Sequence, residues 1–284
     1  MSQNSYIVRA MTQEDLSTCL AYTQEVKWPH LLIDWQLHYD LGKGSVIEDT
    51  QGNVIGTILW WDYGTDYGTV GLVVVPSHMQ GKGLGRALMD TIMEQAGSRN
   101  LQLVATLAGK RLYEQCGFTE CGKIYQIQGI PKTKQTAPLL EGVTYRQLET
   151  SLLPDIIELD NHANQSQRND LIKYFLGNSC GVGLYKEEKL LAYGFVRESG
   201  KGQTIGPIIA NNEISAKSVA AALLQQTNGF VRFDLTEQSS ELKLWLLSLG
   251  LEQVDEVCLM VKGSYLPQNA YSSFNFALAS QAFG

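Results

Sequence analysis

The segment GKGLGR at residues 81–86 combines three alternating glycines with two cations, Lys82 and Arg86. The first N–H groups of a helix have no partner within it, and the helix dipole places partial positive charge there. Glycines let the backbone adopt positive φ and approach a bulky anion closely. If a helix begins in this segment, its N–H groups and the two cations form a site suited to a pyrophosphate.

Two flanking patterns predict the elements that position this loop. Residues 70–75 are an apolar run with four valines, which is typical of a buried strand. Pro76 ends the run because proline cannot donate a ladder hydrogen bond. After Gly85, apolar residues recur at steps of three and four, which predicts a helix to about Ala96. The alternative is an ordinary strand-to-helix turn with solvated cations.

The spacing Gln80-x-x-Gly83-x-Gly85 matches neither the GxxxxGK[ST] nucleotide loop nor the GxGxxG dinucleotide fingerprint. It resembles the (Arg/Gln)-x-x-Gly-x-(Gly/Ala) loop of the GNAT superfamily of acetyl-coenzyme A N-acetyltransferases. About 30 residues later, the stretch LYEQCGF at 112–118 resembles a second motif of that family, in the expected order. The chain departs from the common pattern at Thr106 and Gly109, where many members carry Asn and Ala.

The resemblance implies an α/β fold of the α+β kind, with a mixed, mostly antiparallel twisted sheet flanked by helices. It also implies acetyl-CoA as co-substrate, with pantetheine filling a gap between two central strands. The coenzyme-binding residues implied are Val73, Val74, Val75, Gln80, Gly81, Lys82, Gly83, Leu84, Gly85, Arg86, Thr106, Gly109 and Tyr113. A main-chain N–H near Val73 would polarise the thioester carbonyl. Tyr113 matches the family's general acid, which protonates the leaving thiolate; the alternative is a core tyrosine beside the coenzyme.

The attacking amine must be neutral, and because an alkylamine has a pKa of about 10, it must first lose a proton. Some relatives use a strand carboxylate for this step, but the matching position here is Thr69. Asp66, acting through a water molecule, is the predicted substitute, with Asp62 as an alternative, although both can be simple turn residues. An acyl-cysteine route through Cys116 lacks an evident His partner. The four histidines show no metal-ligand spacing, so no metal is expected.

The overall composition narrows the class of protein. A chain of 284 residues suggests one large or two medium domains, and a formal charge of −7 is unfavourable for nucleic-acid binding. Five scattered cysteines without a CxxC pair predict reduced thiols and a cytoplasmic location. No apolar run reaches about 18 residues, so no membrane span is expected. A monomer or homodimer is expected.

The second half repeats the first in its predicted order of elements. The expected domains are a catalytic GNAT domain at 1–130, a linker at 131–142, a degenerate GNAT-like domain at 143–263 and a docking tail at 264–284. The loop NNEISA at 211–216 has no glycine ladder and no cation, and Glu213 would repel a pyrophosphate. The second domain is therefore predicted to be catalytically silent.

These patterns together predict acetyl transfer from acetyl-CoA to a primary amine of a small, unidentified acceptor by direct attack. The alternatives are a non-catalytic acyl-CoA-binding or sensor module, and an acyltransferase that uses a longer acyl-CoA. The second half is expected to wall the acceptor site. Candidate polar contacts there are Arg168, Arg197, Arg232 and Asp234, although surface salt bridges would explain these residues equally well.

Overall fold

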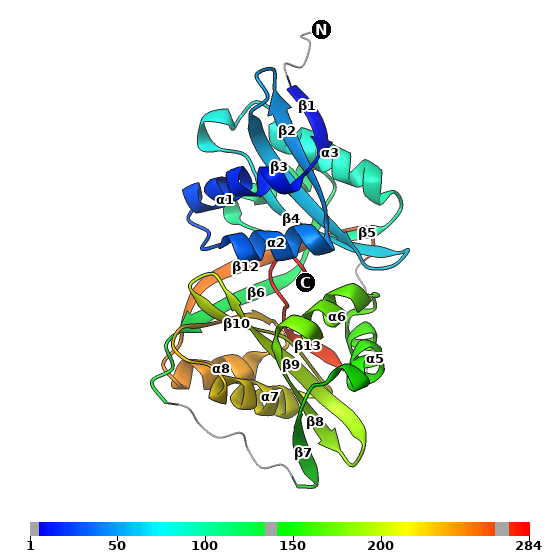
Figure 1. Cartoon of the computed structure of the whole chain (residues 1–284), viewed down its shortest axis with the longest axis vertical. Coiled ribbons are helices and arrows are strands. Elements are labelled where there is room, and N and C mark those ends of the chain that lie inside the picture. Colours follow the sequence, from blue (N-terminus) through cyan, green and yellow to red (C-terminus); the bar gives the residue numbers. More distant parts are fainter. Residues whose placement is uncertain (1–5, 134–140, 265–272) are drawn as a thin grey trace.

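The computed structural model describes residues 6–133, 141–264 and 273–284, and its framework is one 13-stranded sheet (Figure 1). The strand order is β1-β2-β3-β4-β5-β12-β6-β11-β13-β10-β9-β8-β7. The pairs β4–β5 and β10–β11 are parallel, and the neighbouring pairs around them are antiparallel. The predicted mixed, mostly antiparallel α/β fold is confirmed.

The first half begins with an alternation of strands and helices around the predicted loop. Its elements are β1 (Tyr6–Ala10), α1 (Leu16–Glu25), α2 (Leu32–Leu41), β2 (Lys43–Asp49), β3 (Val54–Asp62), β4 (Tyr67–Val74), α3 (Leu84–Ala96), β5 (Asn100–Ala105), α4 (Leu107–Gln115) and β6 (Thr119–Gly129). Adjacent residues of a strand point to opposite faces. Trp60 of β3 accordingly packs in the cluster formed with α3, and Trp61 in the cluster formed with α1 and α2.

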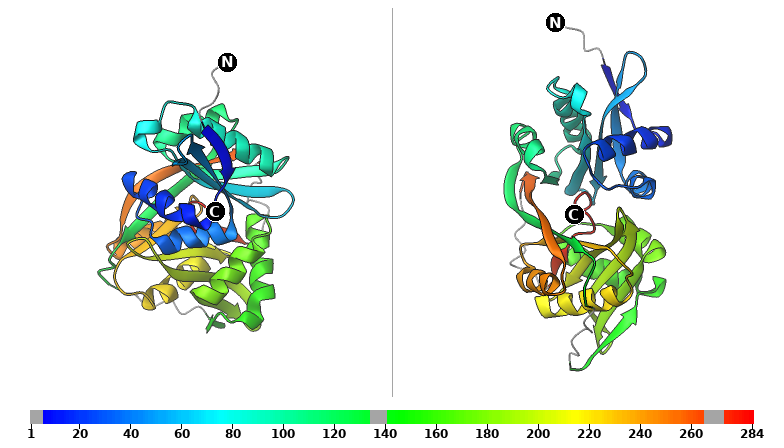
Figure 2. Two further views of the ribbon diagram at one scale, coloured as in Figure 1. Left: turned by 45° about the horizontal axis from the view of Figure 1, so that its top comes forward. Right: turned by 90° about the vertical axis from the view of Figure 1, so that its left-hand side faces the viewer.

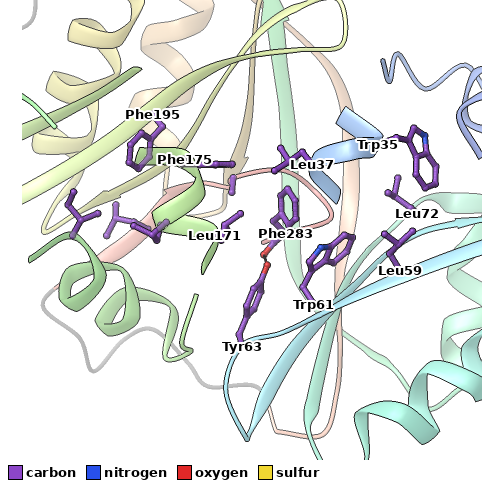
Figure 3. Close-up of a cluster of buried hydrophobic side chains, with 14 of the residues drawn as sticks. Trp35, Leu37, Leu59, Trp61, Tyr63, Leu72, Leu171, Phe175, Phe195 and Phe283 are labelled. Atoms are coloured by element: carbon purple, nitrogen blue, oxygen red, sulfur yellow. Dashed lines mark hydrogen bonds between the residues drawn. The ribbon is translucent and has the colours of Figure 1, made fainter. Parts of the chain in front are cut away.

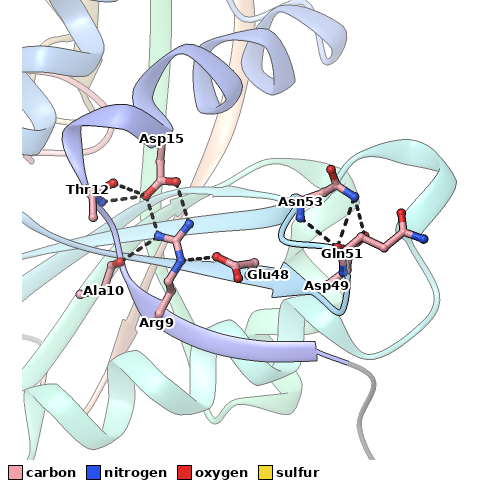
Figure 4. A network of polar contacts seen from close by, with 8 residues as sticks. All are labelled: Arg9, Ala10, Thr12, Asp15, Glu48, Asp49, Gln51 and Asn53. Atoms are coloured by element: carbon pink, nitrogen blue, oxygen red, sulfur yellow. Dashed lines mark hydrogen bonds and ion pairs between the residues drawn. The ribbon is translucent and has the colours of Figure 1, made fainter.

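Local polar contacts fix the start of this half (Figure 4). Arg9 on β1 donates to Asp15 at 2.7 Å and to Glu48 of β2 at 2.5 Å. Asp15 also accepts from the Thr12 N–H at 2.7 Å, which holds the chain where α1 begins. The hairpin turn after β2 is closed by Asp49, which accepts hydrogen bonds from backbone N–H groups of that turn.

The second half repeats this order of elements. They are β7 (Val143–Gln147), α5 (Leu153–Asn164), α6 (Asn169–Asn178), β8 (Cys180–Lys186), β9 (Lys189–Ser199), β10 (Gly202–Ala210), α7 (Glu213–Gln225), β11 (Val231–Thr236), α8 (Ser240–Ser248), β12 (Glu252–Lys262) and β13 (Phe274–Ala277). Within the described ranges, no helix is both long and apolar enough to cross a membrane.

The two halves are joined by strands that cross from one to the other (Figure 2). We expected Val254–Val261 to close the second sheet, but β12 lies between β5 and β6, with Cys258 opposite Ala105. In turn, β6 pairs with β11, with Phe233 opposite Ile127. The domain boundaries therefore remain a prediction, because the sheet runs across them. Most of the predicted linker at 131–142 lies outside the described residues.

The described part of the tail is built into the molecule instead of docking on its surface. Residues 265–272 lie outside the described residues, but β13 pairs with β10 and β11 inside the sheet. Beyond β13, Phe283 is fully buried between the halves and packs against Trp61 and Phe175 (Figure 3). The Tyr63 hydroxyl donates to the Phe283 carbonyl at 2.9 Å. The tail thus forms part of the core that joins both halves.

Candidate functional site

The strands β4 and β5 separate at the position where the coenzyme was expected. Their parallel register runs from Tyr67 opposite Asn100 to Val70 opposite Leu103 and ends there. On the other side of β4, the register with β3 shifts between Gly71 and Val74, which marks a bulge at Leu72. Leu72 has φ of 52°, a left-handed conformation that is uncommon and costly for a residue with a side chain. This strained point lies at the opening between the strands.

The predicted anion loop follows directly after β4. Gly81 and Gly83 have φ of 75° and 79°, so the turn uses the conformational freedom of glycine at these two positions. Helix α3 begins at Leu84, and the Ala87 N–H donates to the Gly83 carbonyl at 3.1 Å. Lys82 is exposed beside the loop, as is Arg86, which bonds Asp90 at 2.7 Å. The loop thus leads into a helix N-terminus, whose first N–H groups and partial positive charge are of the kind that suits an anion.

Helix α4 places three predicted residues on the other side of the opening. Thr106 caps the helix, because its hydroxyl accepts from the Gly109 N–H at 3.3 Å. A side chain at Gly109 would meet the Tyr113 ring at 2.9 Å, so glycine permits this close approach. Tyr113 is buried beside Phe118, and burial raises the pKa of its phenol, which keeps it protonated at neutral pH. Burial also raises the pKa of the Cys116 thiol, which disfavours a nucleophilic thiolate.

A cavity of about 300 Å³ lies between the two halves and reaches this opening. The first half contributes Leu72 of β4 and Thr106 at the start of α4. The second half contributes polar side chains from β9, β10 and β11, and the tail contributes Ser280, Gln281 and Ala282. Neither half could form this cavity alone. It is therefore a candidate acceptor site whose walls come from both halves.

The cavity wall carries both signs of charge. Arg232 and Asp234 face the same side of β11 and form a two-fold hydrogen bond, at 3.0 and 2.8 Å. Arg197 of β9 lies 3.6 Å from Asp34 of α2. These pairs give the cavity polar groups from both halves of the chain.

Two imidazoles also line the cavity, and both are neutral at pH 7. Burial lowers the pKa of His30 to about 4, and it holds the pKa of His38 well below its ordinary value. The His38 ring lies 4.4 Å from the ring of Phe283, between their centroids. His38 thus connects the cavity to the core that joins the halves.

The structure does not bring Asp66 to this cavity. Asp66 is exposed just before β4, six residues from Leu72, which is about 20 Å along an extended strand. Asp62 is bound to Lys43 at 2.7 Å. Of the four residues expected from the second half, Arg197, Arg232 and Asp234 line the cavity. Arg168 does not line it, because it is buried against Asp160 at 2.7 Å and the Gly284 carbonyl at 2.6 Å.

Sequence reasoning did not assign His30 or Asp34 to a site. His38 was considered, but the sequence favoured a role in the core or at its rim. All three lie between the end of α1 and the C-terminal part of α2. The sequence WPH at residues 28–30 lies between these two helices. Nothing in the local pattern indicated that this segment would face strands 150 residues later in the chain.

In the second half, the chain itself occupies the two places that correspond to the strand opening and the glycine loop of the first half. The strand β13 lies between β10 and β11, which correspond to the separating strands β4 and β5 of the first half. At the start of α7, the Asn212 side chain accepts from the Ser215 N–H at 2.9 Å. Glu213 follows it and accepts from the Leu242 N–H of α8 at 2.9 Å. This helix terminus is capped by its own carboxamide and carries a negative charge.

Comparison with known proteins agrees with this architecture. The model of the acetyltransferase (GNAT) family matches residues 9–118, and that of an acetyltransferase (GNAT) domain matches residues 156–274. The chain is 25% identical over 280 residues, or 96% of both chains, to the uncharacterized N-acetyltransferase YitH of Bacillus subtilis. Both halves of the chain therefore have GNAT counterparts.

Solved structures share the fold. A putative acetyltransferase from Pyrococcus horikoshii superposes with a TM-score of 0.78 at 17% identity, covering 100% of this chain and 98% of that one. A tandem GNAT protein from the clavulanic acid biosynthesis pathway gives a TM-score of 0.68 at 15% identity, covering 92% and 100%. At such identities the likeness concerns the fold alone. Together with the two family matches, it shows that this chain is a tandem-domain member of the GNAT family of N-acetyltransferases.

Proposed function

We propose that the first half binds acetyl-CoA and transfers its acetyl group to the amine of a small acceptor bound between the halves. The observation that carries this proposal is the separation of β4 from β5 at Leu72, directly before the glycine loop and open to the cavity. A pantetheine chain placed in that gap would lead from a pyrophosphate on the loop to an acetyl group at the cavity. The donor and the acceptor would then meet at the bulge of β4.

The residues around the gap suit direct attack. Leu72 and Val73 lie at the bulge, outside the register of β3, so a backbone N–H there would be available to polarise the thioester carbonyl. Tyr113, protonated at neutral pH, would donate its proton to the departing thiolate. The acceptor amine must lose its proton before it attacks. His30 and His38 in the cavity wall are neutral, and their lowered pKa makes both weak bases, so the group that takes this proton is left unassigned. Asp66 has no part in this proposal because of its distance.

We further propose that the second half is catalytically silent and serves as the wall of the acceptor site. Its coenzyme gap is filled by β13, and its α7 terminus carries Glu213. A pyrophosphate would be repelled there, and pantetheine would have to displace a paired strand. One coenzyme per chain is therefore expected.

Calorimetric titration of acetyl-CoA into the protein tests both proposals by counting sites. One site per chain, followed by thiol release with a panel of amines, would support them. Two sites would refute the silent second half. A lack of binding would refute acetyl transfer from acetyl-CoA, and binding without turnover of any amine would favour an acyl-CoA-binding module.

A further inference from the structure

Arg197 has a buried guanidinium that the protein does not fully satisfy. Its side chain is 8% exposed and lines the cavity. Within the described part of the chain, its Nε atom has no hydrogen-bond partner. One terminal nitrogen donates to the Ala279 carbonyl at a long 3.3 Å. Buried polar groups usually have partners, so a charged group left in this state requires an explanation.

The neighbouring carboxylates do not supply the missing partner. Asp34 approaches Arg197 to 3.6 Å, beyond hydrogen-bond distance. The Asp34 carboxylate is already engaged by the Leu31 N–H at 2.8 Å, the Ser199 hydroxyl at 2.7 Å and the Gly200 N–H at 3.1 Å. The other buried carboxylate of the cavity, Asp234, is engaged by Arg232. Arg197 is therefore a buried cation with spare donor capacity in this wall, whereas Lys27 and Lys201, which also line the cavity, are exposed.

Among the described residues, two more buried nitrogens at this cavity also lack a hydrogen-bond partner. They are Nδ1 of His30 and Nδ1 of His38. Their rings lie 6.1 Å apart, both side chains line the same cavity as Arg197, and a neutral imidazole can present an N–H at this position. Within the described ranges, these three unpartnered buried nitrogens in one wall leave hydrogen-bonding capacity that a ligand with acceptor oxygens would use.

We propose that the acceptor is an amino acid, an amine that also carries a carboxylate, and that Arg197 binds this carboxylate. The inference rests on the proposed function, because it assigns the substrate class of the same site. The planar fork of arginine matches the two oxygens of a carboxylate, and the pairing is strong where water is excluded. His30 and His38 lie in the same wall and offer additional donors. The free amino group would then point toward the bulge of β4.

The same features disfavour other amines. A polyamine would bring a second cation and no carboxylate, so it would leave the Nε donor of Arg197 unsatisfied. Asp34 and Asp234 are already engaged by groups of the protein. A volume of about 300 Å³ is at the lower end of small-molecule pockets, which suits a compact acceptor. Charge and size therefore both favour an amino acid.

The test compares amino acids with the amines formed by removing their carboxyl group. Lysine and cadaverine, ornithine and putrescine, histidine and histamine, and tyrosine and tyramine are titrated by calorimetry, with and without coenzyme A, and assayed by thiol release. The wild-type protein is expected to bind at least one amino acid at least tenfold more tightly than its partner amine. Arg197→Gln should weaken that amino acid roughly 10- to 100-fold and leave the partner amine within about threefold.

Lys201→Gln is the matched control, because it removes one charge from an exposed cation at the same cavity. It should leave the preference for the carboxylate unchanged. Arg197→Lys keeps the positive charge but loses the planar fork, so it should bind the amino acid more tightly than Arg197→Gln does and less tightly than the wild type. It replaces Arg197→Gln if that variant does not fold.

Two results would overturn the inference: no amino acid binds more tightly than its partner amine, or the preference survives at its full wild-type size in Arg197→Gln (in Arg197→Lys, if that variant has to replace it). Binding is also read without coenzyme. Failure of acetyl-CoA to bind would therefore contradict the proposed function and still leave the amino-acid measurement readable.

Discussion

The clearest test of the anion loop is to place a negative charge on it at Gly83. This residue has φ of 79°, and a Cβ added there would meet nothing within 4 Å. The space is open, so Gly83→Ala should cost about 1 kcal/mol of stability, from the left-handed backbone alone. Gly83→Asp carries the same backbone cost and adds one charge at the site proposed for the pyrophosphate.

The size of the charge effect follows from Coulomb's law. Two unit charges 4 Å apart repel by about 1 kcal/mol at the dielectric constant of water and by about 4 kcal/mol at an effective value of 20. The loop is exposed, so the lower figure applies. The carboxylate introduced by Gly83→Asp would repel each of the two charges of a pyrophosphate by this amount. The sum of roughly 2 kcal/mol corresponds to about 30-fold weaker binding of acetyl-CoA. Gly83→Ala should stay within about fivefold of the wild-type affinity.

Gly97→Asp provides a control for a negative charge placed on α3 away from the loop, although its backbone, with ψ of −126°, differs from the left-handed conformation of Gly83, whose ψ is 2°. Gly97 also has positive φ, at 64°, and open space around an added Cβ, but it lies at the other end of the 13-residue helix α3. That end is about 20 Å from the loop. Calorimetry of all three variants, with thermal unfolding to confirm folding, decides the question. If Gly83→Asp binds acetyl-CoA as tightly as Gly83→Ala does, the pyrophosphate does not bind at this loop.

Three further predictions concern other parts of the molecule. Tyr113→Phe should lower turnover in the thiol-release assay tenfold or more without changing coenzyme affinity, and unchanged turnover would remove Tyr113 from the mechanism. Arg168→Met should lower the free energy of unfolding by about 3–5 kcal/mol in urea titration, because it leaves Asp160 charged and buried; a loss under 1 kcal/mol would contradict this. The Arg9 hydrogen bond lowers the pKa of Asp15, so their stabilisation is present above the ordinary carboxyl pKa of about 4 and is lost as the pH falls below it. When the melting temperature is measured from pH 3 to 7, it should fall less steeply toward acid pH in Arg9→Met than in the wild type. Equal slopes would refute the pair's role.

The sequence could predict the anion loop because all of its determinants are contiguous. The apolar run of β4, the glycines and the periodicity of α3 each specify local backbone conformation, and their order along the chain is their order in space. The polar contacts at Thr12 and in the turn after β2 likewise join residues that are close together in the chain. The silence of the second half was also predicted from local features, the missing glycines and Glu213.

The partners of β6, β12 and β13 could not be predicted, because a strand pattern gives the buried face but not the neighbouring strand. The second half therefore seemed to close its own sheet, whereas β12 lies beside β5 and β13 fills the gap between β10 and β11. The cavity depends on these pairings. They bring β9, carrying Arg197, and α2, carrying His38, to one site.

The sequence by itself thus determined the family, the fold class and the place of the glycine loop before α3, since these depend on short-range patterns. Only the tertiary structure decided which polar groups share the acceptor cavity and which are left without a partner. Burial and hydrogen-bond satisfaction are properties of residues far apart in the chain, and Arg197 and Asp34 meet only after both halves have folded together.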